Sequence, residues 1–352
     1  MIRALFVGSL ANPSASGRQR SWALRACGVN VIEVDIGDFK PTAERLVGNA
    51  ARLLKRPRWT LDAPRLEATV ATLCKEHRPQ LIWIEWPRTF RPGAIEALRK
   101  LADSPVIISF QDDNPFGDRQ TDRWQWKAYF RSIPEFDLHL IKRPEDARHL
   151  ADFGATHTRL WEHGVYTPLY HPSPAEKRYP ASFVGTCMDD RVQFFETLLM
   201  AGLPVHVFGT RWETRSTLPA RFPHLFHGPV FGEAYADVLR TSDIALGLVS
   251  HSNMDEWTMR TYEVPACGTA LLAERTPTHQ RWFEENRDAI FFSGVEECVS
   301  RIQWALEHSD ARIEIASNGA QKACQPDWRL DTRMAVLLKS LFPDWSHSTE
   351  VP

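Results

Sequence analysis

Short apolar runs alternate with helix-like segments along the first half of this 352-residue chain. Helical segments separate the first four predicted strands, Ile2–Val7, Asn30–Asp35, Gln80–Glu85 and Pro105–Phe110. Parallel strands need such crossover helices, so the alternation predicts a parallel sheet covered by helices. In a sheet of this kind, functional side chains collect at the carboxyl ends of the strands.

The same alternation starts again after a proline-rich stretch. Residues 167–182 contain four prolines and little apolar periodicity, which is typical of an interdomain linker. We therefore expect a first Rossmann-like domain over residues 1–166, a second over 183–325, and a terminal helix over 326–342. A chain of this length suits two domains of ordinary size.

Composition excludes several classes of protein. A hydrophobic content of 43% supports real cores, and a net charge of −2 gives no general attraction to nucleic acid. The six cysteines are scattered without a C-x-x-C pair, which favours a reduced, cytoplasmic protein. The N-terminal apolar run is too short for a signal peptide or a spanning helix.

The stretch from Asp255 to Glu274 carries the clearest chemistry. It predicts a short helix that Gly268 ends, followed by a buried strand. Glu256, Arg260 and Glu263 would share one helix face. An arginine there can neutralise a diphosphate, and the carboxylate one turn later can accept hydrogen bonds from ribose hydroxyls. The alternative is a solvated ladder of ion pairs, each worth roughly 0.2–0.5 kcal/mol.

The run R-x-x-E-V-P-A-C-G, from Arg260 to Gly268, resembles the donor-site signature of the CgeB-like glycosyltransferases. These spore-maturation-protein relatives belong among the GT-B sugar transferases, and the likeness extends over roughly Phe183 to Gly319. The resemblance implies an α/β protein of the GT-B class, with two Rossmann-like domains whose parallel sheets face a central cleft. The first domain would take the acceptor and the second the donor, and the terminal helix would cross back to the first.

By the same resemblance, the chain would move a sugar from a nucleoside diphosphate to an acceptor hydroxyl without a catalytic metal or other cofactor. A UDP-sugar is the favoured donor, while the acceptor could be a glycan, a lipid-linked group, a protein or a small molecule. Residues expected to contact the donor are Gly17, Arg18, Arg191, Gly209, Trp212, Asn253, Asp255, Arg260 and Glu263.

Four of these residues carry an alternative. Gly17 and Arg18, with Ser16, either touch the donor phosphate or the acceptor, or belong to a plain tight turn. Arg191 either contacts phosphate or faces solvent. Trp212 either stacks on the nucleotide base or packs under the following loop.

Two places could supply the base that takes the acceptor proton. Asp112 and Asp113 follow the strand that ends at Phe110, and His163 follows a predicted short strand, Arg159–Trp161. The aspartates could instead cap the next turn or bind a metal. His163 could instead be structural.

Two other functions compete with transfer. A GT-B relative could epimerise the nucleotide sugar, or a degenerate transferase could serve as a nucleotide-binding scaffold. Separately, the basic stretch Arg45–Arg65 combines Leu53, Leu54 and Trp59 with several arginines. It predicts either a surface for an anionic acceptor or the inner membrane face, or a solvated helix.

Overall fold

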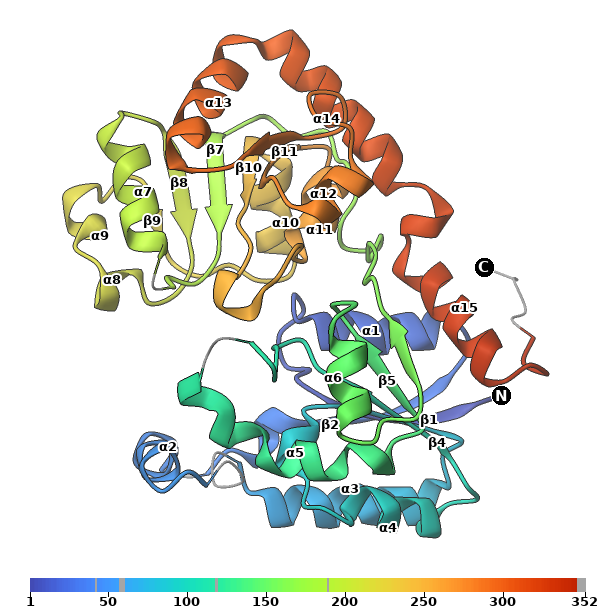
Figure 1. Ribbon diagram of the computed structural model, residues 1–352. Helices are drawn as coiled ribbons and strands as arrows, with labels where there is room; N and C mark the ends of the chain where they lie inside the picture. The colour runs from blue at the N-terminus through green and yellow to red at the C-terminus, as the bar shows by residue number, and fades with distance from the viewer. Residues whose placement is uncertain (42, 57–60, 118–119, 189, 347–352) are drawn as a thin grey trace. The chain divides into compact units, whose positions relative to one another are not determined.

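The computed structural model describes residues 1–41, 43–56, 61–117, 120–188 and 190–346 (Figure 1). The described chain divides into two compact units. Unit 1 comprises Met1–His163, His251–Met254 and the chain from Met334. Unit 2 comprises Gly164–Ser250 and Asp255–Arg333.

Unit 1 is built on a six-stranded parallel sheet in the order β2-β1-β3-β4-β5-β6. Its strands are β1 (Arg3–Gly8), β2 (Asn30–Asp35), β3 (Leu81–Glu85), β4 (Val106–Phe110), β5 (Leu138–Ile141) and β6 (Thr158–Leu160). Its α-helices include α1 (Ser16–Ala26), α2 (Glu44–Leu53), α3 (Ala63–His77), α4 (Ala94–Leu101), α5 (Lys127–Ser132) and α6 (Asp146–Asp152).

Unit 2 repeats this plan with the order β12-β11-β10-β7-β8-β9, again parallel throughout the described strands. Its strands are β7 (Tyr179–Val184), β8 (Val205–Phe208), β9 (Phe226–His227), β10 (Ser242–Gly247), β11 (Ala270–Glu274) and β12 (Ile290–Phe292). Its helices are α7 (Arg191–Met200), α8 (Trp212–Arg215), α9 (Leu218–Arg221), α10 (Glu233–Arg240), α11 (Arg260–Ala266), α12 (Pro277–Trp282), α13 (Val295–Glu307) and α14 (Ser309–Ala323). The final helix, α15 (Leu330–Leu341), is divided between the units after Arg333.

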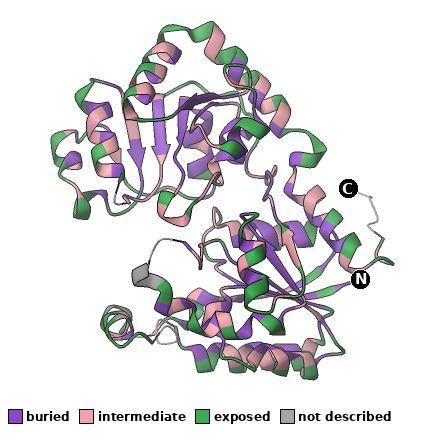
Figure 2. Cartoon of the chain, in the orientation of Figure 1, coloured by how far each residue is buried: buried purple, intermediate pink, exposed green. Residues whose placement is uncertain are grey.

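Burial of the strands explains why the alternation in the sequence is so clear. All five residues of β3 are buried, and both sheets show as buried strands between helices in Figure 2. A parallel sheet covered on both faces needs continuous apolar strands, and it leaves the polar faces to the helices.

Three predicted boundaries need correction. β7 begins at Tyr179, inside the predicted linker, because Tyr179 pairs with Ser242 of β10. Gly17 lies in the first turn of α1 rather than in the preceding loop. α11 begins at Arg260, so Glu256 precedes the helix, and its carboxylate accepts a hydrogen bond from Thr278.

In each sheet, the order in which the chain adds strands reverses at one pair of neighbouring strands. In unit 1 the chain adds β2 on one side of β1 and β3 on the other, so the switch lies between β1 and β3. In unit 2 it lies between β7 and β10 for the same reason. Ligands of open α/β sheets bind outside the carboxyl ends of the strands at such switch points, so both edges are candidate sites.

A buried histidine in β5 predicts a loss of stability in acid. His139 Nδ1 lies 2.6 Å from Ser109 Oγ, and its Nε2 lies 3.0 Å from the carbonyl oxygen of Ile133. Burial lowers the pKa of His139 to about 4. The unfolded chain, in which a histidine titrates near pH 6.5, therefore binds a proton that the folded chain does not take. The contribution is complete above about pH 6.5 and is lost as the pH falls toward about 4.

Urea unfolding at about pH 7.5 and about pH 4.5 tests this expectation. His139→Gln should show a smaller acid loss of unfolding free energy than the wild type, by about 2–3 kcal/mol. The matched control is His157→Gln, since His157 is exposed. An equal acid loss in the wild type and in His139→Gln would contradict the expectation.

Candidate functional site

Two arginines meet at the switch point of unit 2. Arg260, the first residue of α11, donates from Nη1 to the carbonyl oxygen of Val184 at 3.0 Å and from Nη2 to that of Leu248 at 3.1 Å. These carbonyls close β7 and follow β10. Arg191, the first residue of α7, donates from Nη1 to the carbonyl oxygen of Thr186 at 2.9 Å. Both guanidinium groups lie against the Phe183 ring, at 5.1 Å for Arg191 and 5.4 Å for Arg260.

The electrostatics of this arginine pair are unfavourable without an anion. Burial, together with the nearby charge of Arg260, lowers the pKa of Arg191 to about 10, and Asp190 and Glu274 offset only part of this. Arg260 Nε is buried, and no described residue accepts a hydrogen bond from it. Two like charges held together at low exposure favour binding of a negative group. The predicted phosphate contacts, Arg191 and Arg260, are thus brought together.

Glu263 lies one turn after Arg260 and is 2% exposed. Its Oε2 accepts a hydrogen bond from the Tyr235 hydroxyl at 2.7 Å. Burial, and then the charge of Glu263, raises the pKa of Tyr235 well above its ordinary value, so the phenol stays a donor. The solvated ladder is therefore wrong, because Arg260 bonds backbone carbonyls and Glu263 is buried.

Close backbone contact accounts for Gly209. A Cβ at this position would lie 2.1 Å from the carbonyl oxygen of Gly185, so any side chain would force β7 and β8 apart at the edge beside the arginine pair. The neighbouring threonine hydroxyls, Thr186 and Thr210, lie 3.2 Å apart and are exposed there. Gly209 thus allows the segments that follow β7 and β8 to approach closely at this edge.

Trp212 needs correction as a base-stacking residue. It is 1% exposed, its Nε1 donates to the carbonyl oxygen of Gly185 at 3.0 Å, and its ring packs edge-on against Phe195. A ring so enclosed has no free face for a nucleotide base. The structure favours the alternative, in which Trp212 packs within the core of unit 2.

The two loop residues expected at the donor fall into different units. Asp255 is in unit 2, where its N–H donates to the carbonyl oxygen of Ser250 at 3.1 Å. Asn253 belongs to unit 1, where its amide donates to Asp113 Oδ1 at 3.4 Å and its carbonyl oxygen accepts from Asn114 at 3.2 Å.

A second cluster surrounds Asp112 at the carboxyl edge of the unit 1 sheet. Asp112 Oδ2 accepts a hydrogen bond from the Ser16 hydroxyl at 3.0 Å and lies 3.9 Å from Arg20 Nη2. Its Oδ1 lies 4.0 Å from Lys142 Nζ. Loss of hydration would raise the pKa of Asp112, but Lys142, Arg20, the Ser16 hydroxyl and His163 outweigh it, so the pKa lies below its ordinary value. Asp112 is therefore an ionised, half-exposed acceptor, and His163, 1% exposed, lies within its field.

A buried ion pair between Arg20 and Glu85 lies next to Asp112. Arg20 is 1% exposed, and its Nε lies 2.5 Å from Oε1 of Glu85, the last residue of β3. Its Nη2 donates to Ser16 Oγ at 3.0 Å. A Cβ at Gly17 would lie 2.4 Å from Glu85 Oε2, so only glycine leaves room for this carboxylate. The pair thus holds Ser16 and the Arg20 guanidinium against Asp112.

Sequence reasoning missed Arg20 and Lys142 as site residues, and it assigned no role to Glu85, although Glu85 ends a predicted strand. The signal available in the sequence was a charged residue at the end of an apolar strand. Glu85 is the last residue of one such strand, and Lys142 directly follows another. Arg18, which was expected at the site, is engaged elsewhere. Its Nη1 lies 2.8 Å from both carboxylate oxygens of Glu33, and its Nε donates to the carbonyl oxygen of Leu10 at 2.6 Å.

Asp113 lies near a different cation, Arg88, whose Nη1 is 4.0 Å from its Oδ2. Within the described residues, no group of three or more His, Cys, Asp or Glu side chains could hold a metal ion.

In the described part of the basic stretch, residues 45–53 belong to α2 and residues 63–65 to α3. Leu46, Leu53 and Leu54 are exposed there, while Trp59 lies outside the described residues. In the part of the chain that the structure describes, no helix is long and apolar enough to span a membrane. Peripheral contact with a membrane stays a prediction.

Comparison with known proteins gives one family match and several similar structures. Residues 191–339 match a protein family described as glycosyl transferase-like, and no curated protein matches the chain significantly. The chain resembles the sucrose-phosphate synthase of Thermosynechococcus elongatus, with a TM-score of 0.68 and 15% identity over 98% of this chain and 100% of that one. It also resembles Anabaena Alr3699/HepE, solved with UDP-glucose, with a TM-score of 0.66 and 13% identity over 97% and 100%.

A third similar structure, from Listeria monocytogenes, is described as a UDP-N-acetylglucosamine 2-epimerase; its TM-score is 0.57 at 9% identity over 100% and 99% of the two chains. These likenesses, with the two parallel sheets, confirm the predicted GT-B fold class with two Rossmann-like units. The narrower CgeB-like assignment stays a prediction.

Proposed function

We propose that this protein is a glycosyltransferase that moves a sugar from a nucleoside diphosphate, with UDP as the favoured nucleotide, to an acceptor hydroxyl. The observation that carries the proposal is the Arg191/Arg260 pair at the switch point of unit 2. It supplies two positive charges, and a buried Nε donor with no described acceptor, at the edge where this fold binds ligands. The match of residues 191–339 to glycosyl transferase-like proteins supports the same conclusion.

The arginine pair would act on the leaving group. When the bond from the sugar carbon to the diphosphate oxygen breaks, negative charge grows on that oxygen, and preorganised cations stabilise it without a metal. Glu263, oriented by Tyr235, would accept hydrogen bonds from the ribose hydroxyls. Asp255 would face the donor sugar from its loop.

Unit 1 would supply the groups for the acceptor. Asp112 is ionised and carries a free edge for a hydroxyl donor, so it would orient the acceptor and receive its proton if the enzyme inverts configuration. Its lowered pKa makes it a weak base, and His163, whose charge acts on Asp112, would be the second candidate for the proton. If the enzyme retains configuration, Asp112 would only position the acceptor.

A nucleotide panel tests the proposal. UDP, GDP, TDP, CMP and ADP are added in turn to the wild type and to Glu263→Gln, and thermal unfolding is followed. We expect one diphosphate to raise the Tm of the wild type, and Glu263→Gln to bind it about tenfold more weakly, because a charged hydrogen bond to a ligand is worth about 1.5–3 kcal/mol.

Glu233→Gln is the matched control, since Glu233 is an exposed carboxylate of α10, and it should keep the wild-type shift. No shift with any nucleotide would remove the basis for a transferase. Incubation of the donor alone separates transfer from the epimerase alternative, because a new epimer without acceptor would identify an epimerase. Specific binding without turnover for every acceptor class would instead favour the scaffold.

A further inference from the structure

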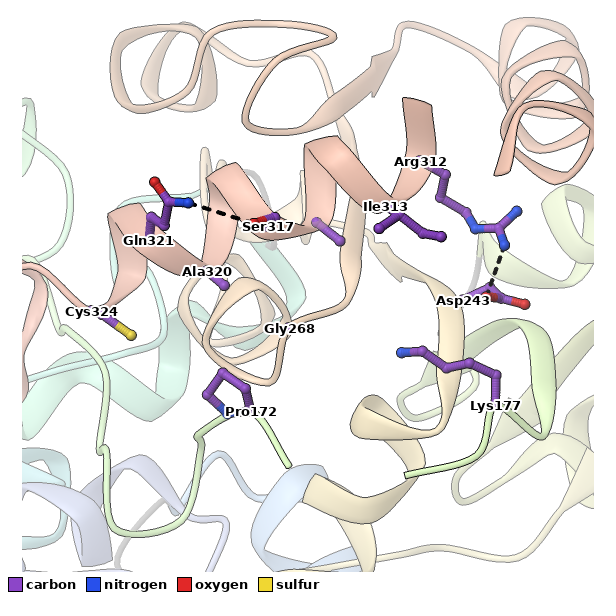
Figure 3. Close-up of a pocket in the computed structure, with 11 residues that line it drawn as sticks. Pro172, Lys177, Asp243, Gly268, Arg312, Ile313, Ser317, Ala320, Gln321 and Cys324 are labelled. Atoms are coloured by element: carbon purple, nitrogen blue, oxygen red, sulfur yellow. Dashed lines mark hydrogen bonds and ion pairs between the residues drawn. The ribbon is translucent and has the colours of Figure 1, made fainter. Parts of the chain in front are cut away.

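A pocket of about 530 Å³ opens on unit 2 between the linker that precedes β7 and one face of α14 (Figure 3). Its charged lining residues are Lys177 from the linker, Asp243 at the start of β10 and Arg312 from α14. The volume falls within the range of small-molecule sites. Asp243 lies at the amino end of the sheet, whereas the arginine pair contacts carbonyls at its carboxyl end, so the two places are on opposite edges.

At one end of the pocket lies Lys177, an ammonium group with a donor to spare. Lys177 Nζ donates to the carbonyl oxygens of Arg240 at 2.8 Å and Ser242 at 2.7 Å. An ammonium has three N–H donors, and no other acceptor for this one is present among the described residues. Figure 3 shows the ammonium reaching into the pocket between Asp243 and Gly268. Burial lowers the pKa of Lys177, and Asp243 only partly offsets this, so an added anion would be stabilising.

The other two charges balance each other. Arg312 Nη2 donates to Asp243 Oδ1 at 3.0 Å, and its Nη1 donates to the carbonyl oxygen of Ala305 at 2.7 Å. With this ion pair neutral overall, Lys177 leaves the lining with one net positive charge. The pocket therefore matches one negative charge rather than a diphosphate.

The rest of the lining is largely apolar, with Ser317 and Gln321 as its hydroxyl and amide side chains. Successive turns of α14 present Ala316 and Ala320 to the pocket, and Pro172 closes the opposite side. Gly268 forms the turn after α11 with a φ of +73°, and a Cβ there would meet Pro172 at 3.4 Å. Small side chains on a helix leave a groove that suits a linear or flat apolar body.

We propose that this pocket is a second ligand site, which binds a small amphipathic monocarboxylate with its carboxylate on Lys177 and its apolar part along α14. The site is distinct from the arginine pair and does not depend on the proposed transfer reaction. Octanoate is the probe used below, because it carries one charge and an unbranched apolar chain.

Cys324 gives a direct readout of occupancy. It lines the pocket and is exposed, while the other five cysteines are buried. Alkylation of the native protein by iodoacetamide therefore reports on Cys324, and Cys324→Ser should remove the reaction. We expect saturating octanoate to slow this alkylation at least about fivefold, and octanol, which lacks the charge, to need about tenfold higher concentration.

Two variants test the two halves of the site. Lys177→Gln should weaken protection by octanoate about tenfold through loss of one charged hydrogen bond. Ala320→Trp should fill the groove and abolish protection without touching Lys177. Glu314→Trp, which places the same ring on an exposed part of α14 outside the lining, should keep wild-type protection.

The alternatives give different results. Equal protection by octanol and octanoate would overturn the charge recognition, and no protection by octanoate would overturn the site itself. Protection of Cys324 by UDP in place of octanoate would show that the pocket belongs to nucleotide binding. Failure of UDP to bind anywhere would leave octanoate protection unchanged, so this site and the proposed transferase function fail separately.

Discussion

We expect Arg260→Ala to raise the dissociation constant for UDP by about 10- to 100-fold, since a charged hydrogen bond is worth about 1.5–3 kcal/mol. The loss in kcat for transfer should be larger, about 100- to 1000-fold, because charge on the leaving oxygen grows in the transition state. Arg260 bonds the carbonyl oxygens of Val184 and Leu248 at the switch point. Its buried Nε has no acceptor among the described residues. Its removal takes away a preorganised donor as well as charge.

Titration calorimetry with UDP, together with initial rates of transfer, measures both effects. Arg260→Lys should fall between alanine and the wild type, because an ammonium keeps the charge but cannot reach the Val184 and Leu248 carbonyls and the ligand at once. Arg221→Ala is the matched control, since Arg221 pairs with Glu196 on the exposed surface of unit 2, and UDP affinity should stay within about twofold.

Loss of folding could mimic loss of binding, so the Tm of each variant is compared in the absence of ligand. Wild-type UDP affinity in a folded Arg260→Ala protein would refute the role of the arginine pair. Arg191→Gln should then also be neutral, whereas our proposal requires it to weaken UDP binding in the same direction.

The second large effect is expected in unit 1, where Glu85→Ala should lower the free energy of unfolding by about 3–5 kcal/mol. The substitution leaves the Arg20 guanidinium buried without its carboxylate, and an unpaired buried charge is costly. Glu76→Ala is the control, because Glu76 is exposed, and its effect should stay within about 0.5 kcal/mol. Urea unfolding at neutral pH measures both.

A double variant separates stability from positioning. Arg20→Met with Glu85→Leu removes both charges and should recover most of the lost stability, because apolar replacements of buried ion pairs are often neutral. Transfer should remain low in this folded protein, since Ser16 and Asp112 lose the guanidinium that holds them. Recovery of activity together with stability would show that the pair is structural alone, and a Glu85→Ala protein as stable as the wild type would contradict the burial argument.

Local sequence patterns predicted the strands and helices well. Asn30–Asp35 has the predicted bounds, and β3 and β4 each begin one residue after the predicted start, because each is an apolar or alternating run between turn-forming residues. Shorter elements such as β9, with two residues, and β12, with three, were missed. A run of that length carries no period, and pairing with a neighbouring strand alone makes it a strand.

The candidate site was predicted in part. Arg191 was named from its place at the start of a predicted helix, and Arg260 from the helix face it shares with Glu263 and from the R-x-x-E run. The structure brings both arginines to the Phe183 ring. Trp212 was misjudged because the residue after a strand can turn inward or outward, and packing against Phe195 and Phe183 decides which. No local signal distinguishes the two outcomes.

The sequence by itself therefore determined the two parallel sheets, the order of most elements and the edges at which chemistry could occur. These depend on apolar periodicity and on breakers within a few residues of each other. Only the tertiary structure decided which charged groups share a site. Arg20 meets Glu85 and Ser16 meets Asp112 across long stretches of chain, and burial makes Glu263 a partner of Tyr235 rather than a solvated charge. Such contacts form only when the strands pair and bring distant parts of the chain together. The free energy of a buried charge depends on every group packed around it, so local sequence does not reveal its partner.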